Sequence, residues 1–379
     1  MKLYKIAVYM LLALLGLGCS DDDNFTLPAI TPEASGTFID ERDGFEYHWV
    51  RIGGKDWMME NSHYRIDDQT KCRFYVDYAH SGEGNPEDKF SEKYGFLYTR
   101  QGALEAVPEG WRLQEVENPN KDYNFGEITL GKIKADDGSD LYYRLIKPMD
   151  FDPNKKYPVI HYVYGGPHSQ LVTNTWNASL RMWEMYMAQH GYVVFVIDNH
   201  GTPNRGKAFE DIIHRQCGQV EMKDQVKGIE WLKSFPWVDA NRIGVHGWSY
   251  GGFMTISLIT NYPDIYKVAV AGGPVIDWKW YEVMYGERYM DTPQENPEGY
   301  AKTSLIAKAK DLKGKLLICQ GAVDPVVVWE QSLSFIRECI KNNVQVDYFP
   351  YPCAEHNVMG RDRIHLMQKV TNYFEDYLK

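Results

Sequence analysis

The chain has 379 residues, of which 44% are hydrophobic and 14% aromatic, and its formal net charge is −11. This length predicts two domains, or one large domain with an addition, and the composition is sufficient for a packed core. An acidic chain gains nothing from neutralising phosphates, so we expect no nucleic acid among its partners.

The first residues have the pattern of an export signal. A short basic start precedes an apolar run, 6–17, that is too short to span a membrane comfortably as a mature helix. Cys19 follows the run, and an acidic Ser-Asp-Asp-Asp tether begins directly after it. We interpret residues 1–18 as a lipoprotein signal peptide and Cys19 as the lipidated residue. The alternative is a plain secretory signal with an incidental cysteine.

The acidic tether resembles the export signal of surface lipoproteins in Bacteroidetes-type bacteria. The resemblance implies a lipid anchor in the outer membrane and a place in the cell envelope, either periplasmic or at the cell surface.

Five cysteines remain after Cys19, and their spacing fits no zinc template. We therefore predict no metal.

Residues 19–36 are polar and contain two prolines, which predicts a linker. From 37 to 113 the pattern is one of short strands and turns. Glu46–Ile52 alternates apolar and polar residues, and Gly53-Gly54-Lys55-Asp56 predicts a hairpin turn. We expect a small β-rich module here.

Residues 37–113 resemble the Fibrobacter succinogenes major paralogous domain, which occurs on bacterial cell-surface proteins. The resemblance is carried by Asp43-Gly44, Tyr47, Val50-Arg51-Ile52-Gly53, Trp57-Met58-Met59-Glu60-Asn61, Tyr94-Gly95-Phe96-Leu97-Tyr98 and Pro108-Glu109-Gly110-Trp111-Arg112-Leu113. The pattern ends after Leu113, so we expect a truncated module. We assign it no catalytic role and expect its aromatic residues to form a core rather than a ligand platform.

Residues 114–125 form a polar join, and an alternation of strands and helices follows from 126 to 379. Near-continuous apolar runs predict strands that are buried on both faces, at 158–164, 192–197, 243–246, 268–271 and 315–319. Helical stretches are expected between and after them, at 180–190, 207–234, 253–261, 327–343 and 362–378. This order predicts a mostly parallel, doubly wound α/β sheet.

The serine of Gly247-Trp248-Ser249-Tyr250-Gly251 stands between a predicted strand and a predicted helix. That context is the nucleophile elbow of an α/β-hydrolase, in which small residues let the chain turn sharply. The alternative is an ordinary glycine-rich turn, since the five-residue pattern alone is a weak signal.

A serine hydroxyl needs a base, and the base needs an acid that orients it. In α/β-hydrolases these residues follow the serine in the order acid, then histidine. Asp324 and His356 each follow a predicted strand downstream of Ser249, so we predict that these three residues are catalytic. Other polar residues could stand near the site, and we expect core or loop roles for His246, His168, His200 and Asp277.

Residues 126–379 resemble the catalytic domain of the prolyl oligopeptidase family, in its dipeptidyl-peptidase IV branch. The matching segments are Tyr164-Gly165-Gly166-Pro167-His168, Asp198-Asn199-His200-Gly201, Gly247-Trp248-Ser249-Tyr250-Gly251-Gly252, Tyr285-Gly286-Glu287-Arg288-Tyr289-Met290, Asp324 and His356-Asn357. The resemblance implies that the Tyr164 hydroxyl and the Tyr250 backbone N–H form an oxyanion hole. It also implies a proline-binding S1 pocket made of Val275, Trp278, Tyr281, Tyr285 and Val327.

Two departures from that family bear on substrate selectivity. Val326 stands where the family has an asparagine that contacts a substrate carbonyl. The family also carries an eight-bladed β-propeller that gates the site, and residues 20–125 have room for only about two blades of roughly 40 residues. We therefore expect no propeller.

These observations predict a serine peptidase that cleaves peptides through an acyl-enzyme, after proline or alanine, and that requires no cofactor. Two alternatives remain open. The first is an esterase or non-selective serine hydrolase, and the second is an inactive remnant that acts as a surface interaction protein. The sequence does not indicate an oligomeric state.

Overall fold

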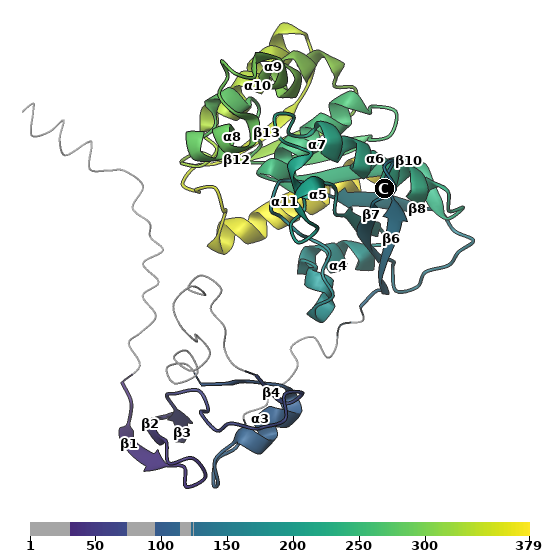
Figure 1. Cartoon of the computed structure of the whole chain (residues 1–379). Coiled ribbons are helices and arrows are strands. Elements are labelled where there is room, and N and C mark those ends of the chain that lie inside the picture. Colours follow the sequence, from purple (N-terminus) through teal and green to yellow (C-terminus); the bar gives the residue numbers. More distant parts are fainter. Residues whose placement is uncertain (1–30, 74–94, 114–122, 124) are drawn as a thin grey trace, which may run out of the picture. The chain divides into compact units, whose positions relative to one another are not determined.

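The computed structural model describes residues 31–73, 95–113, 123 and 125–379, and it divides the chain into two compact units, Met1–Lys121 and Asp122–Lys379 (Figure 1). The predicted signal peptide, Cys19 and most of the predicted join lie outside the described residues. Ser249, Asp324 and His356 all belong to the second unit. None of the helices in the described part of the chain is long and apolar enough to cross a membrane.

The N-terminal unit contains a small antiparallel sheet in the order β1-β2-β3. Its elements are β1 (Ala34–Ile39), β2 (Glu46–Ile52), β3 (Lys55–Met58), β4 (Cys72–Arg73), β5 (Leu97–Tyr98) and α3 (Arg100–Ala106). Gly53 and Gly54 have φ angles of 60° and 70° and join β2 to β3, so the predicted hairpin turn is confirmed. Tyr47 is fully buried, and its hydroxyl accepts a hydrogen bond from the His63 amide at 2.7 Å.

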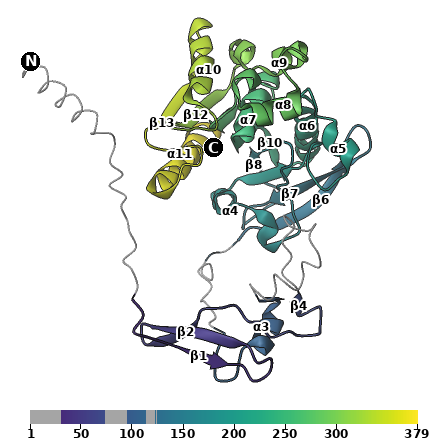
Figure 2. The same ribbon diagram turned by 60° about the vertical axis from the view of Figure 1, so that its left-hand side comes forward.

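The C-terminal unit is built on an eight-stranded sheet in the order β13-β12-β11-β10-β8-β9-β7-β6 (Figure 2). The strands are β6 (Ile128–Lys134), β7 (Asp140–Ile146), β8 (Tyr157–Tyr162), β9 (Val193–Ile197), β10 (Val238–Trp248), β11 (Val268–Gly272), β12 (Lys315–Gly321) and β13 (Asp347–Tyr351). The six strands from β13 to β9 are parallel, and β7 and β6 continue the sheet in antiparallel pairing. The predicted mostly parallel α/β sheet is confirmed.

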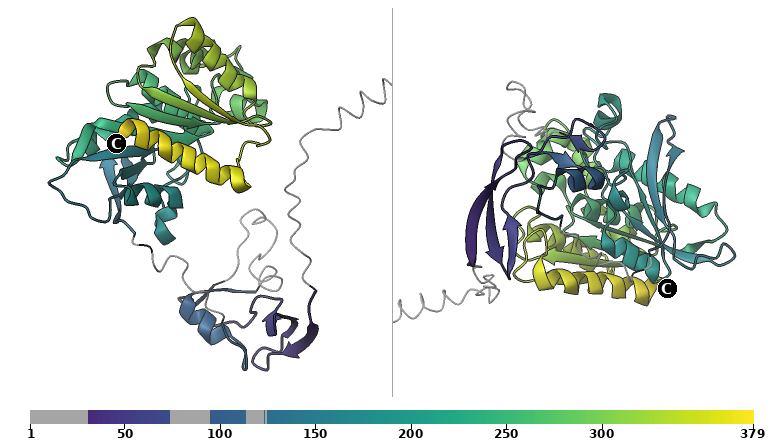
Figure 3. Two further views of the ribbon diagram at one scale, coloured as in Figure 1. Left: turned by 180° about the vertical axis from the view of Figure 1, so that it is seen from behind. Right: turned by 90° about the horizontal axis from the view of Figure 1, so that it is seen from below.

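Helices cover both faces of this sheet. They are α4 (Met182–Gln189), α5 (Lys207–Asp211), α6 (Gln219–Lys233), α7 (Tyr250–Asn261), α8 (Val283–Met290), α9 (Pro297–Thr303), α10 (Trp329–Lys341) and α11 (Gly360–Leu378), with 3₁₀ turns η2 (Trp176–Ser179), η3 (Trp278–Trp280) and η4 (Ile306–Asp311). Side chains of α6, α7 and α10 share one apolar core, and those of α4 and α11 share the other. The view from behind places α11 across the face opposite α7 (Figure 3).

The alternation of side chains along β11 shows why the apolar runs lack a polar face. Val268 and Val270 belong to the core under α4 and α11, whereas Ala269 and Ala271 belong to the core under α7 and α10. All residues of β8, β9 and β11 are buried. Burial of both faces therefore explains the continuous hydrophobic pattern of these strands.

One predicted helix is interrupted. The sequence predicts a single helical stretch over 207–234, but the structure has α5 and α6 with a turn between them. Arg215 and Gly218 in that turn have φ angles of 66° and 83°. Left-handed residues interrupt a helical path, so the chain cannot continue as one helix through 215–218, and α6 begins anew after Gly218.

Three parallel strands end where the predicted catalytic residues begin. β10 ends at Trp248 and is followed by Ser249, β12 precedes Asp324, and β13 precedes His356. Because β10, β11, β12 and β13 are parallel neighbours, their carboxyl ends lie on the same edge of the sheet. The fold thereby brings together three residues that span more than a hundred positions of the sequence, from Ser249 to His356.

Candidate active site

Ser249 occupies a sharp elbow between β10 and α7. Its φ angle is 63°, which is unusual for a residue with a side chain, and its amide donates a hydrogen bond to the Gly272 carbonyl at 2.7 Å. This backbone conformation turns the chain directly from the strand into the helix. Such strain at a single polar residue is typical of functional sites.

The glycines on either side of Ser249 are required by close packing. A Cβ atom added to Gly247 would stand 2.2 Å from the Val163 carbonyl oxygen, and one added to Gly251 would stand 2.3 Å from the same oxygen. A Cβ on Gly252 would approach the Gly272 carbonyl oxygen to 2.5 Å. The backbone leaves no room for any of these side chains, which is why the pattern needs glycine at these positions.

Asp324 and His356 are in direct contact. The His356 Nδ1 lies 2.7 Å from the Asp324 Oδ2, and the Asp324 side chain is fully buried. The Asp324 Oδ1 accepts the backbone N–H groups of Val326 and Val327 at 2.8 and 2.9 Å, and Gln320 donates to Oδ2 at 3.1 Å. These donors hold the carboxylate in one orientation, so that it can fix the imidazole ring.

The backbone around His356 places its ring beside the elbow. The Trp248 indole N–H donates to the His356 carbonyl oxygen at 2.8 Å. Gly273 leaves space for the ring, because a Cβ at that position would come within 3.3 Å of the imidazole Cε1. Ser249 and His356 line one cavity of about 480 Å³. The imidazole therefore shares a common space with the serine hydroxyl.

The two predicted oxyanion-hole residues flank the same serine. Tyr164 lines the same cavity as Ser249, and burial raises the pKa of the Tyr164 hydroxyl. A raised pKa keeps this phenol protonated and able to donate a hydrogen bond. Tyr250 is the first residue of α7, where a backbone N–H has no acceptor within the helix. Both groups can donate toward negative charge that develops near Ser249.

Glu221, which the sequence analysis did not single out, holds the side chain of Tyr250. The Tyr250 hydroxyl donates to the Glu221 Oε1 at 2.6 Å, and both residues are buried. Burial raises the pKa of Glu221 to about 7. A single glutamate in a helical stretch has no sequence signal that separates it from a surface residue, so only the packing of α6 against α7 identifies this contact.

The predicted S1 residues lie in one apolar cluster with Tyr250. Val275, Trp278 and Val327 are buried in the core, and Tyr281 and Tyr285 pack against it. The Trp278 ring centroid is 5.4 Å from that of Tyr281, 5.8 Å from that of Tyr285 and 5.2 Å from that of Tyr250. Flat aromatic walls of this kind suit an apolar ring that carries no N–H.

The other polar residues weighed from the sequence have structural partners. His246 is buried against the Val270 carbonyl oxygen at 2.7 Å, and burial lowers the pKa of His246 to about 4. His200 Nδ1 lies 2.7 Å from Asp224. Asp277 accepts from the Lys279 amide at 3.1 Å and from the Ser304 hydroxyl at 2.8 Å. The exposed His168 lies 3.8 Å from Glu210.

Two further side chains at the Ser249 cavity have no counterpart among the sequence predictions. Arg181, directly before α4, and Arg363, in the first turn of α11, both line it. The two residues are far apart in the sequence and follow no motif, so their convergence depends on the packing of α4 and α11 on the same face of the sheet. Among the described residues, no group of three histidine, cysteine or carboxylate side chains is arranged to hold a metal.

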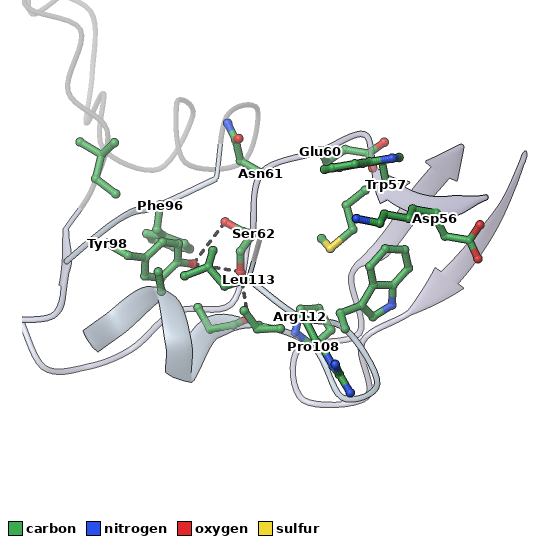
Figure 4. A pocket seen from close by; sticks show the side chains of 17 residues that line it. Asp56, Trp57, Glu60, Asn61, Ser62, Phe96, Tyr98, Pro108, Arg112 and Leu113 are labelled. Carbon is green, nitrogen blue, oxygen red and sulfur yellow. Dashed lines mark hydrogen bonds between the residues drawn. The ribbon is translucent and has the colours of Figure 1, made fainter. Parts of the chain in front are cut away.

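The N-terminal unit has a cavity of its own, of about 650 Å³ (Figure 4). The Tyr98 hydroxyl donates to the Tyr64 carbonyl oxygen at 2.6 Å and fixes one wall. Trp57 is 41% exposed at this cavity, so the expectation that the aromatic residues of this module form a core holds for Tyr47 but not for Trp57. The described lining contains Ser62 but neither histidine nor cysteine, and it offers no nucleophile–base pair.

The fold and the site together define an α/β-hydrolase with a serine, a histidine and an aspartate at the carboxyl edge of its sheet. The chain belongs to the prolyl oligopeptidase family, whose model matches residues 178–379.

Similar proteins include human dipeptidyl peptidase 8, which is 36% identical over 292 residues, or 76% of this chain. The aligned part covers 32% of that protein's length, so the chain spans about a third of the length of the curated relatives it matches. A crystal structure of a Bacteroides ovatus protein of dipeptidyl aminopeptidase IV type is 57% identical, with a TM-score of 0.68, and the match covers 69% of this chain and 37% of that one. The dipeptidyl peptidase 4 of Porphyromonas gingivalis is 26% identical with a TM-score of 0.68, over 91% of this chain and 48% of its own.

Removing the Tyr164 hydroxyl tests its role as an oxyanion donor. We expect Tyr164→Phe to lower kcat by about 10²-fold or more with a smaller change in KM, because the lost hydrogen bond forms mainly in the transition state. Steady-state kinetics on an ester or anilide substrate measure this effect. Tyr142→Phe, at a 40% exposed tyrosine of β7, is the matched control and should leave kcat within twofold. Equal kcat values for the two variants would remove Tyr164 from the oxyanion hole.

Proposed function

We propose that this protein is a serine peptidase that releases dipeptides from the N-terminus of peptides whose second residue is proline or alanine. The observation that carries the proposal is the 2.7 Å contact between His356 and the buried Asp324, with Ser249 on the same cavity. Family membership and the dipeptidyl peptidases among the similar proteins support the same reaction class.

In the proposed reaction, His356 accepts the proton of the Ser249 hydroxyl as the oxygen attacks the substrate carbonyl carbon. The negative charge that forms on the carbonyl oxygen is stabilised by the Tyr164 hydroxyl and the Tyr250 N–H. His356 then gives its proton to the leaving amine, and the C–N bond breaks to leave an ester on Ser249. A water molecule, deprotonated by His356, attacks this ester, and His356 returns the proton to the Ser249 oxygen as the C–O bond breaks and the acid product leaves.

The aromatic cluster supports the preference for proline. The Trp278 and Tyr285 rings are stacked, with an interplanar angle of 12°, and Val275 and Val327 are buried in the same cluster. A pyrrolidine ring has apolar faces and no N–H to satisfy, so it loses little on entering such a pocket. Alanine is small enough to enter the same space.

The release of dipeptides is the most specific part of the proposed function. Val326 cannot donate a side-chain hydrogen bond to a substrate carbonyl. A hydrolase with fewer substrate contacts admits other acyl groups, and this favours an esterase as the second candidate function.

Two chromogenic substrates separate the candidates. We expect wild-type protein to hydrolyse glycyl-prolyl-p-nitroanilide, and Ser249→Ala to lower kcat by about 10⁶-fold because the nucleophile is lost. If the protein hydrolyses p-nitrophenyl acetate but not the anilide, the esterase assignment replaces the peptidase assignment. If a fluorophosphonate probe labels neither wild type nor Ser249→Ala, the remaining assignment is an interaction protein without catalytic activity. Labelling of wild type alone is the expected result.

We further propose that the protein is a lipoprotein of the cell envelope, anchored in the outer membrane through Cys19. The support is the apolar run at 6–17 and the acidic tether that follows Cys19. The unit that follows is proposed to be a truncated Fibrobacter succinogenes major paralogous domain, on the residues of 37–113 that match it.

Metabolic labelling with a palmitate analogue tests the anchor. We expect incorporation into the wild-type protein in a bacterial host that processes lipoproteins, and none into Cys19→Ala, because the thiol is the acceptor. Cys353→Ala, which removes an exposed cysteine elsewhere in the chain, is the matched control and should be labelled like wild type. Equal labelling of Cys19→Ala and wild type would contradict the anchor.

A further inference from the structure

Two guanidinium groups face the cavity that contains the reactive serine. Arg181 and Arg363 both line it, together with Ser249 and His356. Their helices are held together by the Trp183 indole N–H, which donates to the Thr371 hydroxyl at 3.0 Å. The positions of the two cations relative to Ser249 are therefore set by the packing of α4 and α11.

In the described structure no carboxylate lies within ion-pair distance of Arg181 or Arg363, although the charge of Glu184 attracts Arg181 from farther away. The lining of the cavity contains neither aspartate nor glutamate, and neither arginine forms an ion pair with a described residue. Glu184 is close in sequence to Arg181, but its Oε2 is paired with Arg144 at 2.6 Å in a fully buried contact. Its Oε1 accepts the backbone N–H of Arg181 at 3.2 Å. Both oxygens of this carboxylate are thus occupied.

The two cations also act on each other. Burial lowers the pKa of Arg363, and the positive charge of Arg181 lowers it further. The guanidinium of Arg181 lies over the Tyr162 ring, 5.4 Å from its centroid, which holds it near the cavity. Like charges kept near each other without an ion-pair partner favour the binding of an anion.

The proposed role of His356 as proton donor to the leaving amine assigns the leaving group to the side of this cavity. His356 is the residue that gives a proton to the leaving amine, and both His356 and Asn357 line the cavity. The S1 residues Trp278, Tyr281 and Tyr285 do not line it. The acyl part of the substrate and its leaving part therefore contact different sets of residues.

We propose that Arg181 and Arg363 bind a carboxylate on the leaving part of the substrate, and so select peptides that carry negative charge within the first residues after the cleaved bond. The charge can come from the free C-terminus of a short peptide or from an acidic side chain. A planar guanidinium donates two parallel hydrogen bonds to a carboxylate, which gives both affinity and orientation. This inference rests on the proposed hydrolase activity of Ser249 and adds the chemical class of substrate.

Matched peptide pairs measure this preference. The first pair is alanyl-prolyl-alanine with a free carboxylate and the same tripeptide as its C-terminal amide. The second pair carries aspartate or asparagine directly after the proline, with an amidated C-terminus in both peptides. The readout is the ratio of kcat/KM for the charged and the neutral member, measured by mass spectrometry of the released alanyl-proline. We expect a ratio of about ten in at least one pair, and the pair that shows it identifies the source of the carboxylate.

Charge-removing variants connect the preference to the two arginines. We expect Arg363→Gln and Arg181→Gln each to reduce the ratio, and the double variant to bring it to about one. Arg363→Lys should retain part of the preference, because the positive charge remains, and it guards against a loss caused by misfolding. Arg337→Gln, at an exposed arginine of α10, is the matched control and should keep the wild-type ratio. Ratios near one for both pairs in wild type, or an unchanged ratio in the double variant, would overturn the proposal.

An ester pair keeps this inference distinct from the peptidase assignment. If wild type cleaves neither peptide pair, the proposed peptidase activity is wrong, and the leaving-group site is tested with 4-acetoxybenzoate and 4-acetoxybenzamide. Comparing their kcat/KM ratio in wild type and in the double variant removes the intrinsic difference in reactivity. A ratio that falls in the double variant supports the carboxylate site, and an equal ratio overturns it. Turnover of neither ester nor peptide removes both proposals.

Discussion

The contact between His356 and Asp324 is the interaction on which the proposed chemistry of this protein depends. A serine hydroxyl reacts only if a base takes its proton, and an imidazole is an effective base only in one tautomer and one orientation. Asp324 is fully buried and accepts backbone N–H groups from Val326 and Val327, so its carboxylate cannot turn away from His356. The turn after β12 therefore determines the position of His356, the proposed catalytic base.

The parallel sheet places Ser249 on the same edge as the contact between His356 and Asp324. β10, β12 and β13 each end on the same edge and deliver one of the three residues, and the strained Ser249 stands where close packing excludes side chains at Gly247 and Gly251. The two faces of the sheet contribute different parts. The core under α7 contains the aromatic cluster that is proposed to receive the acyl part of the substrate. On the other face, Arg181 directly before α4 and Arg363 of α11 line the Ser249 cavity, where the leaving group is proposed to lie.

The sheet, the elbow and the order of the three catalytic candidates could be predicted from the sequence, because each depends on local pattern or on chain order. Apolar runs such as 268–271 predict strands buried on both faces, and glycines next to Ser249 indicate a sharp turn. The break between α5 and α6 at Arg215 was missed, since a non-glycine residue with positive φ has no signal in composition. Glu221, Arg181 and Arg363 were also missed. Their roles arise from contacts between helices that are far apart in the chain, and a single sequence contains no record of such contacts.

The rate at which a fluorophosphonate labels Ser249 tests most directly whether Asp324 orients His356. The account predicts that Asp324→Asn lowers this rate by about 10⁴-fold, because the amide stabilises the wrong tautomer of the imidazole, as it does in other serine hydrolases of this type. Asp277→Asn, at a second buried aspartate whose described contacts do not include His356, should label within tenfold of wild type. A folded Asp324→Asn protein that labels as fast as Asp277→Asn would contradict the account.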